Sequence, residues 1–319
     1  MATRKHLSEF GLNMQAERKA ICRLSELDYL ATKNYFNDDY PCHIYFIGTR
    51  PKITVDKNGF KFDDNSFTLK FRAQIQDEFE ELELDFENIN KSKDLRFESK
   101  YPYFSFKVFE GEKEIIYTNG PGLLQSMGPN KIGKFYKNLD FKVLYIGQSY
   151  GEEGARTAPD RLKSHSTMQS IFEEANKNNP DKDVMLGLFT FKQWLIMSFD
   201  GTMKLSDEEK ANDQKHLENV TYNVLEKGIK EQQEINFTEA ALIRYFKPEY
   251  NDKFKETFPS PAHSTYSECY DIDINSISIE FLTQDLRCRF YSDEVKPNWE
   301  HFAFFNLHTY ADRKGMFDF

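Results

Sequence analysis

The hydrophobic pattern of the chain changes along its length. Apolar side chains such as Ile21, Leu24 and Leu27 recur at helical spacing within the first 40 residues, which predicts a helical N-terminal segment. Beyond it, apolar and polar residues alternate with a period of two, as in 67–71 and 82–86. This alternation is typical of an antiparallel sheet with one solvated face.

A second unit begins near residue 104 and combines strands with helices. Its expected strands are 104–109, 114–117, 141–147 and 184–191, and its expected helices are about 161–177, 207–227 and 238–246. After Pro259 the pattern returns to strands. We therefore expect an α+β protein with three regions: 1–103, helical and then β-rich; 104–258; and 259–319, β-rich and able to pack on the first.

Charge and cysteine usage narrow the function classes. The net charge of −10 argues against a protein that coats nucleic acid. Positive charge is nevertheless concentrated in one segment, because residues 131–170 hold seven basic and four acidic side chains. The four cysteines form no Cys-x-x-Cys pair, which indicates reduced thiols in a cytoplasmic protein rather than a zinc site. No signal segment and no membrane span are expected.

The segment 77–87 contains seven acidic residues and no basic one. Two interpretations stay open. The segment is either the solvated face of a strand, or a negatively charged surface that is autoinhibitory or that docks a protein partner or a second copy of the chain.

Five residues form a candidate set for cutting a phosphodiester. Tyr145 ends an expected strand, and Arg161 and His165 are four apart on one helix face. Glu239 is expected in the first turn of a later helix, and Asn251 follows that helix. A tyrosine hydroxyl can help to deprotonate water, an arginine fork binds phosphate oxygens, and one carboxylate can hold a divalent metal.

This set resembles the GIY-YIG endonuclease superfamily over about residues 104–255, nearest to its restriction-enzyme branch. Tyr145-Ile146-Gly147 matches the second hallmark tripeptide. Arg161, His165, Glu239 and Asn251 match the family's arginine, a histidine of that branch, the metal-binding glutamate and the asparagine after a proline. The resemblance implies a small antiparallel sheet of three strands flanked by helices, with β-rich additions on both sides.

The resemblance further implies a metal-dependent endonuclease that holds Mg²⁺ or Mn²⁺ at Glu239. Its expected substrate is double-stranded DNA, and its expected setting is restriction or anti-phage defence. The family often carries a lysine after the tripeptide, where this chain has Gln148. The expected nucleic-acid contacts are therefore Gln148, Lys142 and Lys163.

A literal Gly-Ile-Tyr, the first hallmark, is missing. Tyr117 is the preferred stand-in for its tyrosine, and Tyr136 and Tyr103 are alternatives. The run 45–48, Tyr-Phe-Ile-Gly, looks like the second tripeptide, but no arginine and histidine follow it at the right distance. A second function class stays open: a non-catalytic module that keeps the fold and binds nucleic acid or protein.

Overall fold

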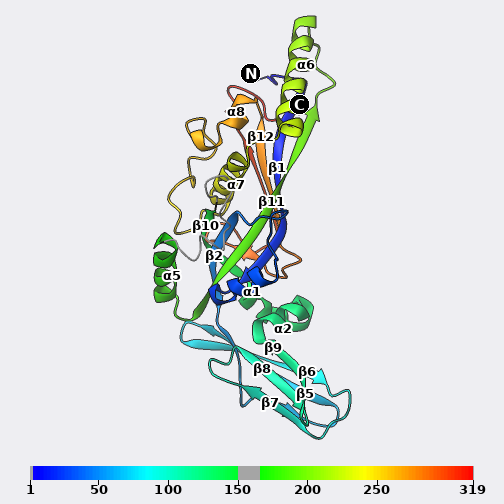
Figure 1. Ribbon diagram of the computed structural model, residues 1–319, viewed down its shortest axis with the longest axis vertical. Helices are drawn as coiled ribbons and strands as arrows, with labels where there is room; N and C mark the ends of the chain where they lie inside the picture. Colours follow the sequence, from blue (N-terminus) through cyan, green and yellow to red (C-terminus); the bar gives the residue numbers. More distant parts are fainter. Residues whose placement is uncertain (1–2, 150–165, 319) are drawn as a thin grey trace.

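The computed structural model describes residues 3–149 and 166–318 and has a mixed α/β fold built on one large curled sheet (Figure 1). This sheet has seven strands in the order β13-β10-β2-β11-β1-β12-β14. Their bounds are β1 Ser8–Cys22, β2 Ile44–Pro51, β10 Phe141–Gln148, β11 Lys182–Phe199, β12 Ser276–Leu282, β13 Phe290–Tyr291 and β14 Glu300–Asn306. The pairs β1–β12 and β10–β13 are parallel, and the other pairs are antiparallel.

Helices cover both faces of the main sheet. The helix α7 (Glu231–Phe246) buries Phe237, Ile243 and Phe246 in one core together with Phe46 of β2. The helices α1 (Leu27–Thr32) and α5 (Ser166–Asn178) contribute to a second core on the other face, which includes Tyr45 of β2. A fully buried strand such as β2 is expected when both faces of a sheet are covered.

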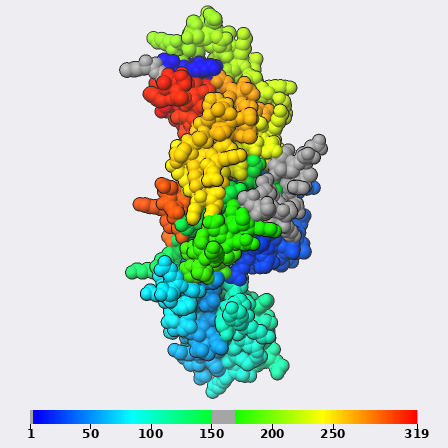
Figure 2. All heavy atoms as spheres, turned by 90° about the vertical axis from the view of Figure 1, so that its left-hand side faces the viewer, coloured from blue at the N-terminus to red at the C-terminus, as the bar shows by residue number. Residues whose placement is uncertain are grey.

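Residues between β2 and β10 form a second lobe with its own core. It contains two small antiparallel sheets, shown at the lower end of Figure 1 and as the cyan part of Figure 2. Its strands are β3 Ile53–Val55, β4 Lys61–Phe62, β5 Ser66–Ile75, β6 Glu78–Glu87, β7 Leu95–Ser99, β8 Ser105–Glu110 and β9 Lys113–Asn119. The helices α2 (Gly120–Met127) and α3 (Pro129–Ile132) lead back to the main sheet through the 3₁₀ segment η2 (Gly133–Leu139).

The remaining helices lie after β11. The helix α6 (Asp207–Thr221) projects at the end of the molecule opposite the second lobe (Figure 1). It continues into η4 (Tyr222–Glu226), and α8 (Glu268–Asp271) precedes β12. No helix within residues 3–149 and 166–318 is long and apolar enough to cross a membrane.

The expectation of a helical N-terminal segment is wrong. Residues 8–22 form β1, and only the 3₁₀ turn η1 (Leu24–Glu26) and α1 are helical in the first 40 residues that the structure describes. β1 pairs with β11 along one edge and with β12 along the other. Because both of its faces are largely buried, its apolar residues show no clean period of two.

The strands of the second unit agree better with expectation. The hairpin near 104–117 is confirmed as β8 and β9, and the strand at 141–147 as β10. The region boundaries fall elsewhere, because the main sheet takes strands from all three expected regions, 1–103, 104–258 and 259–319. The boundary at 103/104 lies inside the second lobe.

Candidate functional site

The candidate site is built where β10 pairs with β2. In the antiparallel register, Gly147 lies opposite Tyr45, and Tyr145 lies opposite Ile47. The ring centroids of Tyr45 and Tyr145 are 6.1 Å apart. The run 45–48, which the sequence reading set aside, is therefore the strand that stands beside Tyr145-Ile146-Gly147.

Gly147 lies directly against the side chains of both tyrosines. A Cβ atom at this position would lie 2.5 Å from the Oη atom of Tyr45 and 2.8 Å from the Cε1 atom of Tyr145. Real Cβ contacts are not this short, so the glycine leaves the space that the Tyr45 hydroxyl fills. The Tyr45 ring is buried and the Tyr145 ring is half-buried.

The other candidates for the first-strand tyrosine lie in the second lobe. Tyr117 is on β9, is 66% exposed and has Lys107 over its ring. Tyr136 is buried in that lobe's core and donates its hydroxyl to the Arg287 carbonyl at 2.6 Å. Tyr103 precedes β8 and stacks edge-on with Tyr101. None of the three shares a strand pair with Tyr145 in the described sheets.

Glu239 reaches the end of β10 through Gln148. The Gln148 Nε2 atom donates to Glu239 Oε2 at 3.1 Å and to Asn236 Oδ1 at 2.7 Å. The helix α7 begins at Glu231, so Glu239 sits in the middle of this helix and not in its first turn, as the sequence suggested. A capping role for Glu239 is excluded because Lys230 is the N-cap residue.

Asn251 holds the backbone of the same strand from the other side. Its Nδ2 atom donates to the Ile146 carbonyl at 2.8 Å, and its Oδ1 atom accepts from the Ile146 N–H at 2.9 Å. The Asn251 side chain is buried. This pair of hydrogen bonds takes the place of a neighbouring strand beside Ile146, so Asn251 fixes the backbone of the tripeptide.

The residues that the sequence predicted to contact the phosphate or the nucleic acid are only partly described by the structure. Lys142 lies on β10, and its Nζ atom forms an ion pair with Asp293 at 2.7 Å. Arg161, Lys163 and His165 lie outside the described residues. Gln148, as shown above, bonds to α7.

His43 is a site residue that the sequence reading missed. Its Nδ1 atom lies 2.8 Å from the Ser149 carbonyl oxygen, and its Nε2 atom lies 3.3 Å from Glu231 Oε1. The Ser149 N–H also donates to the His43 carbonyl, which continues the pairing of β2 with β10. The sequence signal that could have indicated His43 is the run His43-Ile44-Tyr45, which leads into β2.

A cavity of about 370 Å³ opens next to His43, between the N-terminal half of α7 and the strands β1, β2 and β11. Glu17, Glu231 and Glu234 line it together with the apolar Phe189 and Ile235. Burial, followed by the charges of Glu231 and Glu268, raises the pKa of Glu234 to about 7. The cavity therefore holds a carboxyl group that titrates near neutral pH.

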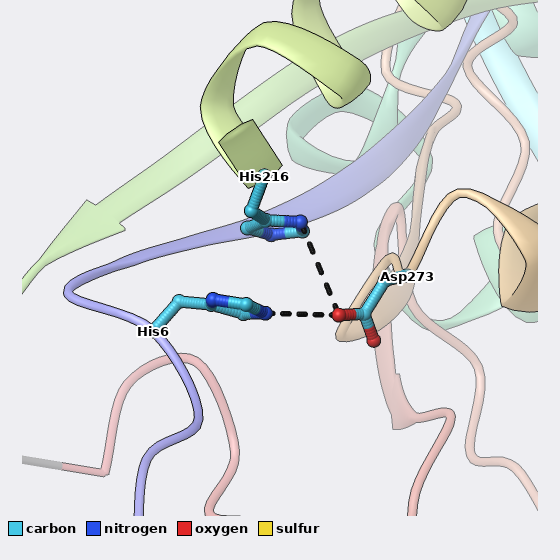
Figure 3. Close-up of side chains that lie close together, drawn as sticks. All are labelled: His6, His216 and Asp273. Carbon is cyan, nitrogen blue, oxygen red and sulfur yellow. Dashed lines mark hydrogen bonds and ion pairs between the residues drawn. The ribbon is translucent and has the colours of Figure 1, made fainter. Parts of the chain in front are cut away.

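A separate His/Asp cluster lies toward the α6 end of the molecule (Figure 3). His6 and His216 are stacked with centroids 3.8 Å apart, and the His6 Nε2 atom lies 2.9 Å from Asp273 Oδ2. Lys5 and Arg313 form ion pairs with the same carboxylate, at 2.8 Å and 2.7 Å. These two cations already neutralise Asp273, and imidazole nitrogens are poor ligands for Mg²⁺. The cluster joins the N-terminal segment, α6 and the connection between α8 and β12, and Arg313 links it to the C-terminal segment.

Comparisons with known proteins find no relative of this chain: no family model, no curated protein and no solved structure gives a significant match.

Proposed function

We propose that the chain is a metal-dependent endonuclease that hydrolyses phosphodiester bonds in DNA at the site formed by β2, β10 and α7. One observation carries the proposal: Tyr45 and Tyr145 lie side by side on antiparallel strands, and Glu239 meets the end of the second strand. The antiparallel order β10-β2-β11, with α5 and α7 packed on it, also supports a GIY-YIG-like core.

The proposal assigns the first-strand tyrosine to Tyr45 in place of Tyr117. The hydroxyls of Tyr45 and Tyr145 then orient the attacking water, and a tyrosine whose own proton has passed to His165 accepts the water's proton as a phenolate, a role that requires groups within hydrogen-bond reach of the reacting atoms. Arg161 is proposed to neutralise the scissile phosphate, and His165 to assist a tyrosine. Asn251 acts indirectly, because it fixes the backbone from which Tyr145 projects.

The residues around Glu239 fit a hard divalent cation. Glu239 offers a carboxylate, and the neighbouring Gln148 and Asn236 carry amide oxygens; amide and carboxylate oxygens are ligands that suit Mg²⁺ or Mn²⁺. Mg²⁺ typically needs only one or two protein carboxylates and keeps several waters. Glu239 would hold the ion, which supplies positive charge to the phosphate and the leaving oxygen. The Gln148 amide must release the Glu239 carboxylate when the ion binds.

A non-catalytic nucleic-acid- or protein-binding module is the second candidate. The hydrogen bond that Gln148 donates to Glu239 favours this second candidate, because it occupies the carboxylate that a metal ion would need. The net charge of −10 points the same way for a protein partner.

The partner proposal for segment 77–87 is weakened by contacts within the lobe. Glu80 pairs with Lys137, and Glu81 pairs with Lys70 and Arg72, so part of the acidic charge is already neutralised. A protein partner or a second copy of the chain would meet the remaining exposed carboxylates along β6.

Plasmid cleavage with Mg²⁺ or Mn²⁺ tests the enzymatic proposal. We expect cutting by the native chain and loss of cutting in Glu239→Gln. Glu208→Gln, which removes an exposed carboxylate on α6, serves as the matched control and should cut normally. Cutting that survives in Glu239→Gln removes this residue from the mechanism. Binding of DNA without cutting under any metal favours the second candidate.

A biological setting is proposed from the same resemblance. Restriction or anti-phage defence in the cytoplasm fits an endonuclease with four free, buried cysteines. The second lobe, inserted between the two tyrosine strands, is then the candidate for target recognition.

A further inference from the structure

The strand β11 extends beyond β2, its neighbour on one side. β2 pairs with β11 only as far as Phe189, opposite Ile44, whereas β1 accompanies β11 to its end at Phe199. From Phe191 to Phe199, the edge of β11 that faces away from β1 therefore has no neighbouring strand in the described sheets. In Figure 1 this part of β11 lies on the right-hand border of the molecule, below α6.

The backbone groups along this edge are open. In an antiparallel pair, every second residue directs its N–H and C=O toward the partner strand, and the residues between them direct theirs away. Between Phe191 and Met197, the described residues offer the backbone no hydrogen-bond partner other than β1. A row of unpaired N–H and C=O groups of this kind is a template for another strand.

The side chains along this edge do not protect it. Natural sheets shield an exposed edge with charges, prolines, bulges or very short strands. The stretch 191–199 contains neither a proline nor an acidic residue, and Lys192 is its only charged residue. Trp194 on one face, and Met197 and Phe199 on the other, are 50%, 56% and 58% exposed. Exposed apolar side chains therefore flank the open backbone on both faces of the sheet.

We propose that a second copy of this chain pairs antiparallel with this edge, so that the two main sheets join into one. Pairing of one edge with itself is isologous, so it closes at two copies instead of growing into a fibre. With the two-fold axis at Leu195, Lys192 would stand opposite Ser198 and Trp194 opposite Ile196. No like charges then meet, and each tryptophan ring gains a β-branched neighbour across the strand pair.

Charge and space favour a second copy as the occupant. The chain carries a net charge of −10, and two copies approach each other most easily along a stretch that has no carboxylate. The cavity of about 370 Å³ next to His43 lies at the start of this edge, where Phe191 and Lys192 line it. It leaves room for the end of the incoming strand. The contact is distinct from the acidic segment 77–87, and it uses no residue of the tyrosine site.

Sedimentation equilibrium of the full chain in EDTA, without DNA, tests the proposal. A strand edge with its flanking side chains is smaller than a standard interface of about 1,600 Å², so we expect a monomer–dimer equilibrium in the micromolar range. Trp194→Lys and Met197→Lys should each weaken the dimer about tenfold or more, because each dimer then holds two new charges beside the paired strands. Phe302→Lys makes the same kind of change at a 64% exposed aromatic residue on β14 and should associate like the native chain.

Mixing two variants tests the antiparallel register. With the axis at Leu195, the two Trp194 side chains are diagonal neighbours on one face of the joined sheet, about 7–8 Å apart. Trp194→Lys mixed with Trp194→Glu should therefore dimerise about tenfold more tightly than either variant alone, since opposite charges then face each other. A mixture that associates no better than its two components contradicts this pairing.

Hydrogen exchange of the native chain gives a readout that depends on no variant. The amides of 191–197 that face away from β1 should exchange slowly in concentrated solution and rapidly after dilution, because only the dimer protects them. Exchange that is equally fast at both concentrations overturns the proposal. So does a chain that stays monomeric throughout the micromolar range, or a dimer that Phe302→Lys weakens as much as Trp194→Lys.

Discussion

The rings of Tyr45 and Tyr145 lie 6.1 Å apart on paired strands, although the entire second lobe separates the two residues in the chain. The lobe leaves the main sheet after β2 and returns at β10, where Lys142 is paired with Thr49. An insertion at this place keeps the strand pair intact. The second lobe is attached at the C-terminal end of β2 and the N-terminal end of β10. His43 and Gln148 lie at the opposite ends of these two strands.

The first prediction concerns the hydroxyls of Tyr45 and Tyr145. Tyr45→Phe and Tyr145→Phe each remove one hydroxyl and keep the ring, so packing should be preserved. If the hydroxyls take part in proton transfer, DNA cleavage should fall by about 10²-fold or more in each variant. Single-turnover cleavage measures the effect. Tyr117→Phe, on the exposed face of β9, should cleave normally. Full activity in Tyr45→Phe would contradict the assignment of this residue.

The second prediction concerns the stability of a Gly147→Ala variant. The Cβ atom of Gly147→Ala would meet the Tyr45 Oη atom at 2.5 Å, so the ring or the strand must move. Overpacking of this kind costs about 1–3 kcal/mol of unfolding free energy. Gly201→Ala is the matched control, because its Cβ would meet nothing closer than 3.5 Å. Urea unfolding compares the two. Equal stability of the two variants would show that the tyrosines do not confine this position.

Part of the candidate site could be read from the sequence because it depends on local pattern. The strand that carries Tyr145 and the exit of the helix before Asn251 have clear apolar runs and a proline signal. The start of α7 was placed too late, although Ile235 and Phe237 continue its buried face toward the N-terminus. Glu239 was therefore expected to be near a helix end.

The first tyrosine could not be found by spacing. Tyr45 and Tyr145 meet through a non-local strand pair, and the intervening lobe removes any fixed distance between the two motifs. Local pattern also failed for β1, where pairing with β11 overrides the helical spacing in which Ile21 takes part. In both cases the deciding interaction is a long-range ladder of hydrogen bonds, which no window of the sequence contains.

Asn251 makes the third prediction. Asn251→Ala removes both hydrogen bonds to Ile146 and leaves a buried N–H and a buried carbonyl unpaired. The expected loss of unfolding free energy is about 2–4 kcal/mol, since each unsatisfied buried group costs about 1–3 kcal/mol. Asn90→Ala, which removes an exposed hydrogen bond to Glu110, should cost less than about 0.5 kcal/mol. Chemical denaturation measures both. A small effect in Asn251→Ala would mean that β10 is held by its other contacts.

Acid sensitivity makes the last prediction. Burial lowers the pKa of His216 and of His301 from 6.5 to about 4, with the nearby His6 as a further cause for His216. Although the raised pKa values of Glu234 and Asp140 act in the opposite direction, the unfolded chain therefore binds more protons than the folded chain at these two histidines between pH 4 and pH 6.5. Their contribution to stability is complete above pH 6.5 and is lost as the pH falls toward 4, on the order of 3 kcal/mol for each histidine.

Unfolding free energies measured from pH 7 to pH 4 check this slope. Relative to the native chain, His301→Gln should lose less stability as the pH falls, because this proton-linked group is gone, whereas His263→Gln at a less buried position should keep the native pH dependence. The depressed pKa of Asp273 acts in a lower window, since its stabilising charge is lost only as the pH falls below the ordinary carboxyl range. The same pH dependence in the native chain and in His301→Gln between pH 6.5 and pH 4 would contradict the burial of a neutral His301 in the fold.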